Sequence, residues 1–138
     1  MYLLDTNVVS ELRPGKAKAS GQVLAWAASV PKEVIYLSSI TVLEQEQGVL
    51  ALERRTPPQG VSLRAWWNGT LEGFNGRILS LGAKEALLCA SLHVPNPKSY
   101  RDSMIAAIAL SHGFTVVTRN VDDFKAMVDV KLLNPWEL

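Results

Sequence analysis

The sequence is poor in the residues that most often carry enzyme chemistry. Among 138 residues it has one cysteine, Cys89, and two histidines, His93 and His112. A single cysteine excludes an internal disulfide and is compatible with a reducing cytosol, so we expect a cytoplasmic protein. The spacing of these residues suits neither a zinc site nor catalysis by a cysteine or histidine.

Long hydrophobic runs and a strong excess of charge are also missing. No apolar run approaches the roughly 20 residues that cross a bilayer, and Met1–Asp5 lacks a basic leader. We therefore expect neither a membrane anchor nor a signal peptide. The net charge is only +1, so any affinity for a nucleic acid would depend on metal ions or on local basic clusters. One such cluster is Arg13, Lys16 and Lys18. The alternative interpretation is that these residues are ordinary solvated charges on the surface.

The residues that are present predict a folded α/β protein. Hydrophobic residues make up 48% of the chain and charged residues 20%, as in globular proteins. This length predicts one domain, over residues 1–138. Strands are expected at residues 2–4, 34–37, 114–117 and 130–133, and helices at 6–12, 23–28, 39–55, 61–81, 83–92 and 102–111. This alternation predicts a three-layer sandwich, in which helices flank a mostly parallel sheet.

The helix expected at residues 61–81 has an unusual apolar surface. Its stripe consists of Leu63, Trp67, Leu71, Phe74 and Ile78, and three glycines weaken it. Trp66 lies beside Trp67, so apolar residues occupy more than one face of the helix. Such a helix packs either against its own core alone or also against a partner. The sequence leaves both interpretations open.

Three carboxylates occupy related positions in this arrangement. Asp5 follows the first strand, Glu44 lies in the helix after the second strand, and Asp102 begins the helix before a later strand. The carboxyl ends of parallel strands and the adjoining helix starts meet along one edge of a sheet, so we expect these acids to converge. Clustered negative charges repel one another unless a positive group lies between them. A divalent cation that prefers oxygen ligands, Mg²⁺ or Mn²⁺, would be a natural counter-charge.

Each of these acids also has a purely structural interpretation. Asp5 and Thr6 are residue types that cap helices. Asp102 lies where the helix macrodipole favours a negative charge. Thr41 and Glu44 have the spacing of a capping box. Spacing alone therefore predicts an α/β domain with an acidic edge and leaves the function of that edge open.

Four segments resemble the motifs of PIN-domain proteins, in the order in which that family has them. They are Leu3-Leu-Asp-Thr-Asn-Val8, Ser38-Ser-Ile-Thr-Val-Leu-Glu44, Arg101-Asp-Ser-Met-Ile-Ala-Ala107 and Thr118-Arg-Asn-Val-Asp-Asp-Phe124. The resemblance spans nearly the whole chain and is closest to the virulence-associated or plasmid-stability toxins of the VapC and FitB type. It implies the PIN-like form of the three-layer α/β fold.

The resemblance also implies a set of site residues. Asp5, Glu44 and Asp102 match the family's metal-binding acids, which would hold Mg²⁺ or Mn²⁺. The fourth polar position of the family falls on Asn120, where many relatives have aspartate. Asp123 would contribute through a water molecule, or would instead pair with Asn120 in a cap-like turn.

Two threonines lie beside the residues of this implied site. Thr6 follows Asp5, and Thr118 follows a predicted strand. Their hydroxyl groups are suited to hydrogen-bonding a ligand carboxylate or a substrate phosphate. At a strand edge and a helix cap, threonine also has ordinary structural roles, so both interpretations stay open.

The activity that the resemblance implies is metal-dependent cleavage of RNA by the toxin of a type II toxin–antitoxin system. Hydrolysis would leave a 5′-phosphate and a 3′-hydroxyl. The implied partners are RNA, a second copy in a homodimer, and a small antitoxin whose arginine would compete with the metal. The alternative is a non-catalytic PIN fold that binds a partner protein and uses its acids as helix caps. A phosphoryl-transfer domain is disfavoured because the chain lacks a glycine-rich phosphate loop.

Overall fold

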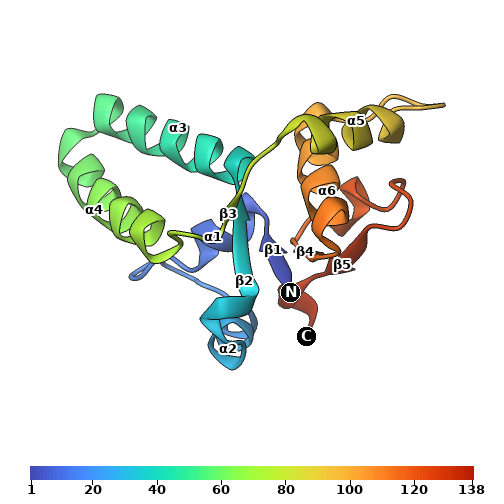
Figure 1. The fold of residues 1–138 in the computed structure, drawn as a ribbon. Helices are drawn as coiled ribbons and strands as arrows, with labels where there is room; N and C mark the ends of the chain where they lie inside the picture. The colour runs from blue at the N-terminus through green and yellow to red at the C-terminus, as the bar shows by residue number, and fades with distance from the viewer.

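A sheet of five parallel strands forms the centre of the protein, whose computed structural model describes residues 1–138 (Figure 1). The strand order is β3-β2-β1-β4-β5, and each neighbouring pair is parallel. The strands are β1 (Tyr2–Leu4), β2 (Ile35–Ser38), β3 (Ile78–Leu79), β4 (Thr115–Val117) and β5 (Lys131–Leu133). The predicted parallel sheet is confirmed.

Six α-helices connect the strands, close to the predicted positions. They are α1 (Thr6–Glu11), α2 (Gly21–Ser29), α3 (Ser39–Arg55), α4 (Pro57–Gly73), α5 (Ala83–Leu92) and α6 (Tyr100–His112). Three 3₁₀ turns lie at Lys32–Val34, Val121–Asp123 and Pro135–Glu137. Gly113 ends α6 with φ +70°, the left-handed conformation predicted for it. None of the helices combines the length and apolar character that a membrane span requires.

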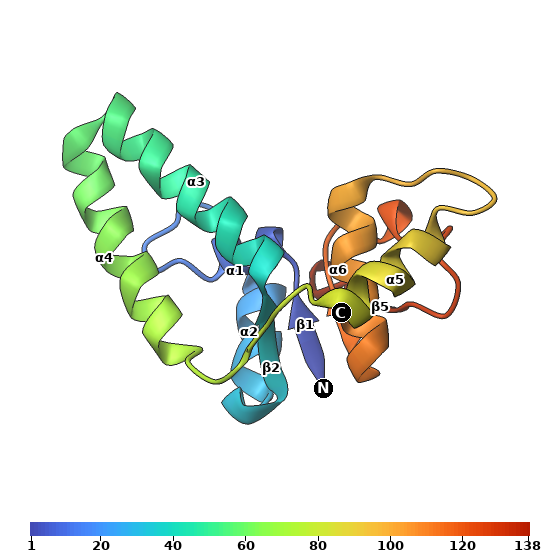
Figure 2. The same ribbon diagram turned by 45° about the horizontal axis from the view of Figure 1, so that its top comes forward.

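Helices cover both faces of the sheet, which confirms the three-layer prediction. Successive residues of a strand point to opposite faces. Leu4 therefore packs in a cluster with residues of α1, α2, α3 and α4, while Leu3 packs in a second cluster with residues of α6. Figures 1 and 2 show α5 and α6 together on one side, and the α3–α4 hairpin extending from the other. Burial on both faces explains why β1 is apolar at Leu3 and Leu4 alike.

The helix predicted over residues 61–81 is wrong at its C-terminal end. Helix α4 ends at Gly73, and the chain then turns at Gly76 with φ +83°, a conformation that favours glycine. Ile78 and Leu79 form β3 beside β2, a strand that the sequence analysis did not predict. Ile78 fitted the helical stripe because it packs against the same core cluster as the residues of α4.

The two tryptophans of α4 turn inward. Trp67 is 0% exposed, and Trp66 is half-buried against the same core cluster. Trp67 Nε1 donates a hydrogen bond of 3.2 Å to Oε1 of Glu46 in α3. For Trp67, the interpretation as a residue of the domain core is therefore correct.

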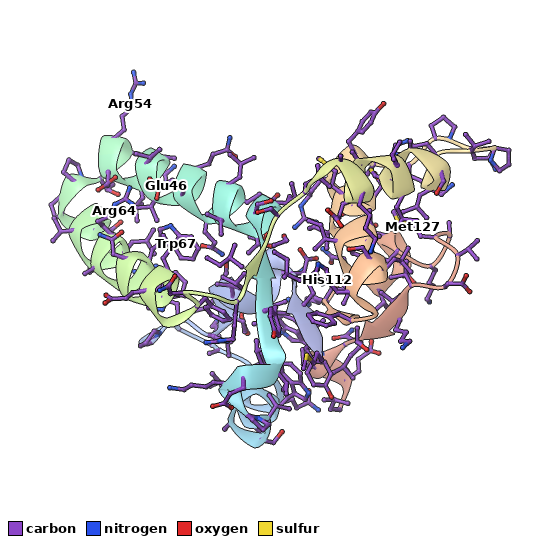
Figure 3. The ribbon with its side chains drawn as sticks, viewed as in Figure 1. Glu46, Arg54, Arg64, Trp67, His112 and Met127 are labelled. Atoms are coloured by element: carbon purple, nitrogen blue, oxygen red, sulfur yellow. The ribbon has the colours of Figure 1, made fainter.

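Charged side chains join α3 to α4 along the hairpin (Figure 3). Arg64 donates to both carboxylate oxygens of Glu46, at 2.7 and 2.8 Å. It also donates to both oxygens of Glu53, at 3.2 and 2.9 Å. The helices approach so closely that a β-carbon added at Gly60 would lie 2.7 Å from the Cα of Glu53. The hairpin therefore requires a glycine at residue 60.

We expect Gly60→Ala to destabilise the protein by about 1–3 kcal/mol, because the added methyl group meets backbone atoms. Gly69→Ala in the same helix is the matched control, since a β-carbon there has no neighbour within 4 Å. Alanine at that exposed position should stabilise the helix by up to about 1 kcal/mol. Urea unfolding of the two variants measures both changes. Equal effects of the two substitutions would contradict the close approach of α3 and α4.

Candidate active site

The order of the strands reverses beside β1. From β1 the sheet continues through β2 and β3 on one side and through β4 and β5 on the other. In open α/β sheets, ligands bind at the carboxyl ends of the strands where the order reverses in this way. Asp5 follows β1 and Thr118 follows β4 at this position. Thr118 Oγ1 donates a hydrogen bond of 2.8 Å to Asp5 Oδ2.

Asp5 is fully buried and is held by both of its neighbouring elements. Its backbone N–H donates to the carbonyl oxygen of Val117 at 2.8 Å, which extends the pairing of β1 with β4. Its Oδ1 accepts from the backbone N–H of Thr6 at 2.7 Å, so Asp5 is the N-cap of α1. The capping interpretation is therefore correct for Asp5. This role still leaves the carboxylate in contact with residues outside α1.

Glu44 does not cap a helix, so the capping-box interpretation is wrong for this residue. The N-cap of α3 is Ser38, whose Oγ accepts from the backbone N–H of Thr41 at 3.1 Å. The helix begins at Ser39, so Thr41 already lies inside it and cannot be its N-cap, as the capping box would require. The Glu44 side chain extends towards α1 instead, where Thr6 Oγ1 donates to its Oε1 at 2.5 Å.

Asp102 reaches the same edge of the sheet from the other layer. It lies in the first turn of α6, which is capped by Ser99, and its side chain is 12% exposed. A helix that leads into a parallel strand starts at the carboxyl edge of the sheet, since it must return the chain to the opposite edge. This direction brings the start of α6 close to the end of β1.

The three carboxylates meet around Arg101, for which the sequence analysis predicted no role. Arg101 Nη2 lies 2.6 Å from Asp5 Oδ1, Nε lies 2.7 Å from Glu44 Oε2, and Nη1 lies 2.8 Å from Asp102 Oδ1. An arginine among these acids was expected only from an antitoxin, whereas this arginine belongs to the chain itself. Its one signal in the sequence was its place next to Asp102 in the third motif.

The contacts determine the charge state of the cluster. Burial alone would raise the pKa of Glu44, but the hydrogen bonds from Arg101 and Thr6 outweigh it and lower that pKa below its usual value. Burial opposes the charge of Arg101, but the carboxylates around it raise its pKa above the usual value. One guanidinium faces three carboxyl groups, so the cluster can accept further positive charge.

The chemistry of these side chains suits a divalent cation. The donor atoms are carboxylate oxygens, which Mg²⁺ and Mn²⁺ prefer, and they already surround a cationic group. With Arg101 between them, no group of three acidic, histidine or cysteine side chains is arranged to coordinate one metal ion. The carboxylate oxygens fit a divalent cation by their chemistry.

Asn120 and Asp123 lie outside this cluster. Both are exposed, and neither side chain is hydrogen-bonded to Asp5, Glu44 or Asp102. The backbone N–H of Asn120 donates to Thr118 Oγ1 at 3.0 Å. Asn120 begins the 3₁₀ turn that contains Asp123, and the backbone N–H of Asp123 donates to the carbonyl oxygen of Asn120 at 3.1 Å. The two residues therefore pair through the backbone, while the side chain of Asn120 makes no capping hydrogen bond.

Two amide side chains support the site, although the sequence analysis gave them no such role. Asn7 Nδ2 donates to Thr118 Oγ1 at 3.4 Å. Gln45 is buried and donates to the carbonyl oxygen of Thr6 at 3.3 Å and to Ser10 Oγ at 2.9 Å. Gln45 therefore ties α3 to α1. The only signal for either residue was its position close to a predicted acid.

Comparisons with known proteins agree with this architecture. The PIN domain family model matches residues 2–129. The plasmid stability protein StbB of Pseudomonas syringae pv. tomato is 36% identical, and the VapC ribonuclease Y4jK of Sinorhizobium fredii is 37% identical, with 99% of each chain covered in both comparisons. The crystal structure of FitAcB from Neisseria gonorrhoeae matches with a TM-score of 0.85 and 38% identity, over 100% of both chains. The chain therefore belongs to the PIN domain family, in the group that includes the VapC and FitB toxins.

Proposed function

We propose that the protein is an endoribonuclease dependent on Mg²⁺ or Mn²⁺, and the toxin of a type II toxin–antitoxin system. The main support is the convergence of Asp5, Glu44 and Asp102 on one cationic group at the carboxyl edge of the sheet. Relatives named VapC ribonuclease and toxin FitB, each 37% identical over 99% of the chain, support the reaction class and the role as a toxin.

The carboxylates of Asp5, Glu44 and Asp102 would hold the cation. When bound, it would act as a Lewis acid that activates water and stabilises charge on the phosphate. The products in our proposal are a 5′-phosphate and a 3′-hydroxyl, which the resemblance to the family implies. The chain's own contribution is to orient the carboxylates. Thr118 holds Asp5 at Oδ2, and Thr6 holds Glu44 at Oε1, so the oxygens Oδ1 and Oε2 face the centre of the cluster.

The surface charges of the protein give only limited attraction for RNA. Within the predicted basic cluster, Lys16 forms an ion pair with Glu11, while Arg13 and Lys18 form none. A phosphate that approached the three carboxylates without a cation would be repelled. In our proposal, binding of RNA at the cleavage site therefore depends on the cation.

The partners in our proposal are a small antitoxin and a second copy of the chain. A chain in the structure of FitAB bound to a DNA fragment is 37% identical to this chain, with a TM-score of 0.88. That relative forms a complex, which supports a partner of the antitoxin kind for this chain. Leu87, Val94 and Val128 are apolar and 73–76% exposed, which supports an interface with another protein.

Replacing Asp5 by asparagine tests the site. The amide retains the shape that caps α1 but removes a charged ligand, so metal-dependent cleavage of RNA should fall by about 100-fold or more while the protein stays folded. Cleavage of total RNA with Mg²⁺ or Mn²⁺, together with circular dichroism, measures both outcomes. Asp122→Asn is the matched control, since Asp122 is exposed and pairs only with Lys125. Unchanged cleavage by Asp5→Asn, with contaminating nucleases excluded, would refute the proposed site.

Calorimetry with Mn²⁺ separates the nuclease from a non-catalytic PIN fold. We expect the wild-type protein to bind Mn²⁺, and the Asp5→Asn and Asp102→Asn variants to lose that binding because each removes a charged oxygen ligand. A chelator should abolish cleavage, and added Mg²⁺ should restore it. A folded wild-type protein that binds no divalent cation would favour the alternative function, a module that only binds a partner protein.

A further inference from the structure

Arg101 is more tightly held than a surface arginine. Three of its nitrogen atoms each contact a different carboxylate, at 2.6, 2.7 and 2.8 Å. These carboxylates come from the end of β1, from α3 and from α6, so the contacts join separate parts of the fold. Charge-assisted hydrogen bonds of this length are strong, and three of them hold the guanidinium in one orientation.

The oxygens that bind Arg101 are the ones that a metal ion would need. They are Asp5 Oδ1, Glu44 Oε2 and Asp102 Oδ1. The other oxygens of Asp5 and Glu44 accept hydrogen bonds from Thr118 and Thr6. The guanidinium and a divalent cation also repel each other at contact distance. The cation and Arg101 therefore exclude each other from the centre of the cluster.

We propose that Arg101 is an intramolecular competitor for the divalent cation, which neutralises the acidic cluster until the cation displaces it. This inference rests on the proposed function, because it assumes that the three acids bind a cation. The Arg101 side chain has access to solvent, since it is 33% exposed, whereas the side chain of Asp5 is 0% exposed. The guanidinium can leave towards solvent while Thr118 holds the carboxylate of Asp5 and Thr6 holds that of Glu44.

Competition by Arg101 has two consequences for the protein. First, the cation-free protein stays folded, because the buried charge of Asp5 always has a partner. Second, the apparent affinity for the cation is lower than the intrinsic affinity, because only the molecules in which Arg101 has left the cluster can bind the cation. The site would then fill only at a higher concentration of free cation than it would without Arg101.

Arg101→Gln tests the competition through the binding of Mn²⁺, measured by calorimetry without RNA. Removal of the competitor should tighten Mn²⁺ binding by about tenfold. Arg54→Gln is the matched control, because it makes the same change in net charge at an exposed position near the end of α3 (Figure 3), ten residues after Glu44 in the same helix. Its Mn²⁺ affinity should equal that of the wild-type protein.

Thermal unfolding gives a second measurement that does not depend on activity. In chelator, Arg101→Gln should unfold at a lower temperature than the wild-type protein, because Asp5 has lost its cationic partner. Added Mn²⁺ should raise the unfolding temperature of Arg101→Gln more than that of the wild-type protein or Arg54→Gln. If Arg101→Gln does not fold in chelator, Arg101→Lys replaces it. Lysine keeps the charge but loses the planar set of donors, so its Mn²⁺ affinity should lie between those of wild type and Arg101→Gln.

The results that would overturn the inference differ from those that would overturn the proposed function. Equal Mn²⁺ affinity in the wild-type protein and both Arg101 variants would refute competition and leave the metal site standing. Weaker binding in Arg101→Gln would also refute it, since Arg101 would then assist the cation. No Mn²⁺ binding in any variant would refute the metal site and the competition together.

Discussion

Negative charge at the carboxyl edge of the sheet is balanced by a single guanidinium, and the local structure depends on this balance. The carboxylate of Asp5 is fully buried, and a buried charge is tolerated only when it is paired and hydrogen-bonded. Arg101, Thr6 and Thr118 supply those partners. Three segments far apart in the sequence thereby share one cluster. Any cation that enters this cluster must replace the pairing that Arg101 already provides.

The fold brings these segments together through the direction of its strands. Parallel pairing places the ends of β1 and β4 side by side, and the helix before β4 starts at the same edge. Helix α3 is anchored there by Ser38 and Gln45, whereas Arg64 and Trp67 attach α4 further along the same helix. The position of Glu44 is thus set by the sheet at one end of α3 and by the α3–α4 hairpin at the other.

The errors in the sequence analysis have identifiable physical causes. The short strand β3 was assigned to a helix because Ile78 packs against the same core cluster as the residues of α4, and a stripe of apolar residues does not distinguish a strand from a helix here. Glu44 was weighed as a helix cap because Thr41 and Glu44 have the spacing of a capping box, although the residue that caps α3 is Ser38. In both cases the local pattern matched two structures, and packing between distant segments selected one of them.

Sequence alone determined four of the five strands and the approximate positions of the helices, and that acids stand where parallel strands end, because burial and backbone periodicity act over neighbouring residues. The motifs it contains were sufficient to indicate the PIN family, which the comparisons confirm. Only the tertiary structure decided which side chains meet. Arg101 lies 96 residues from Asp5 and 57 from Glu44 in the chain. Contacts over such separations arise from the packing of whole helices on the sheet, which no local pattern of residues encodes.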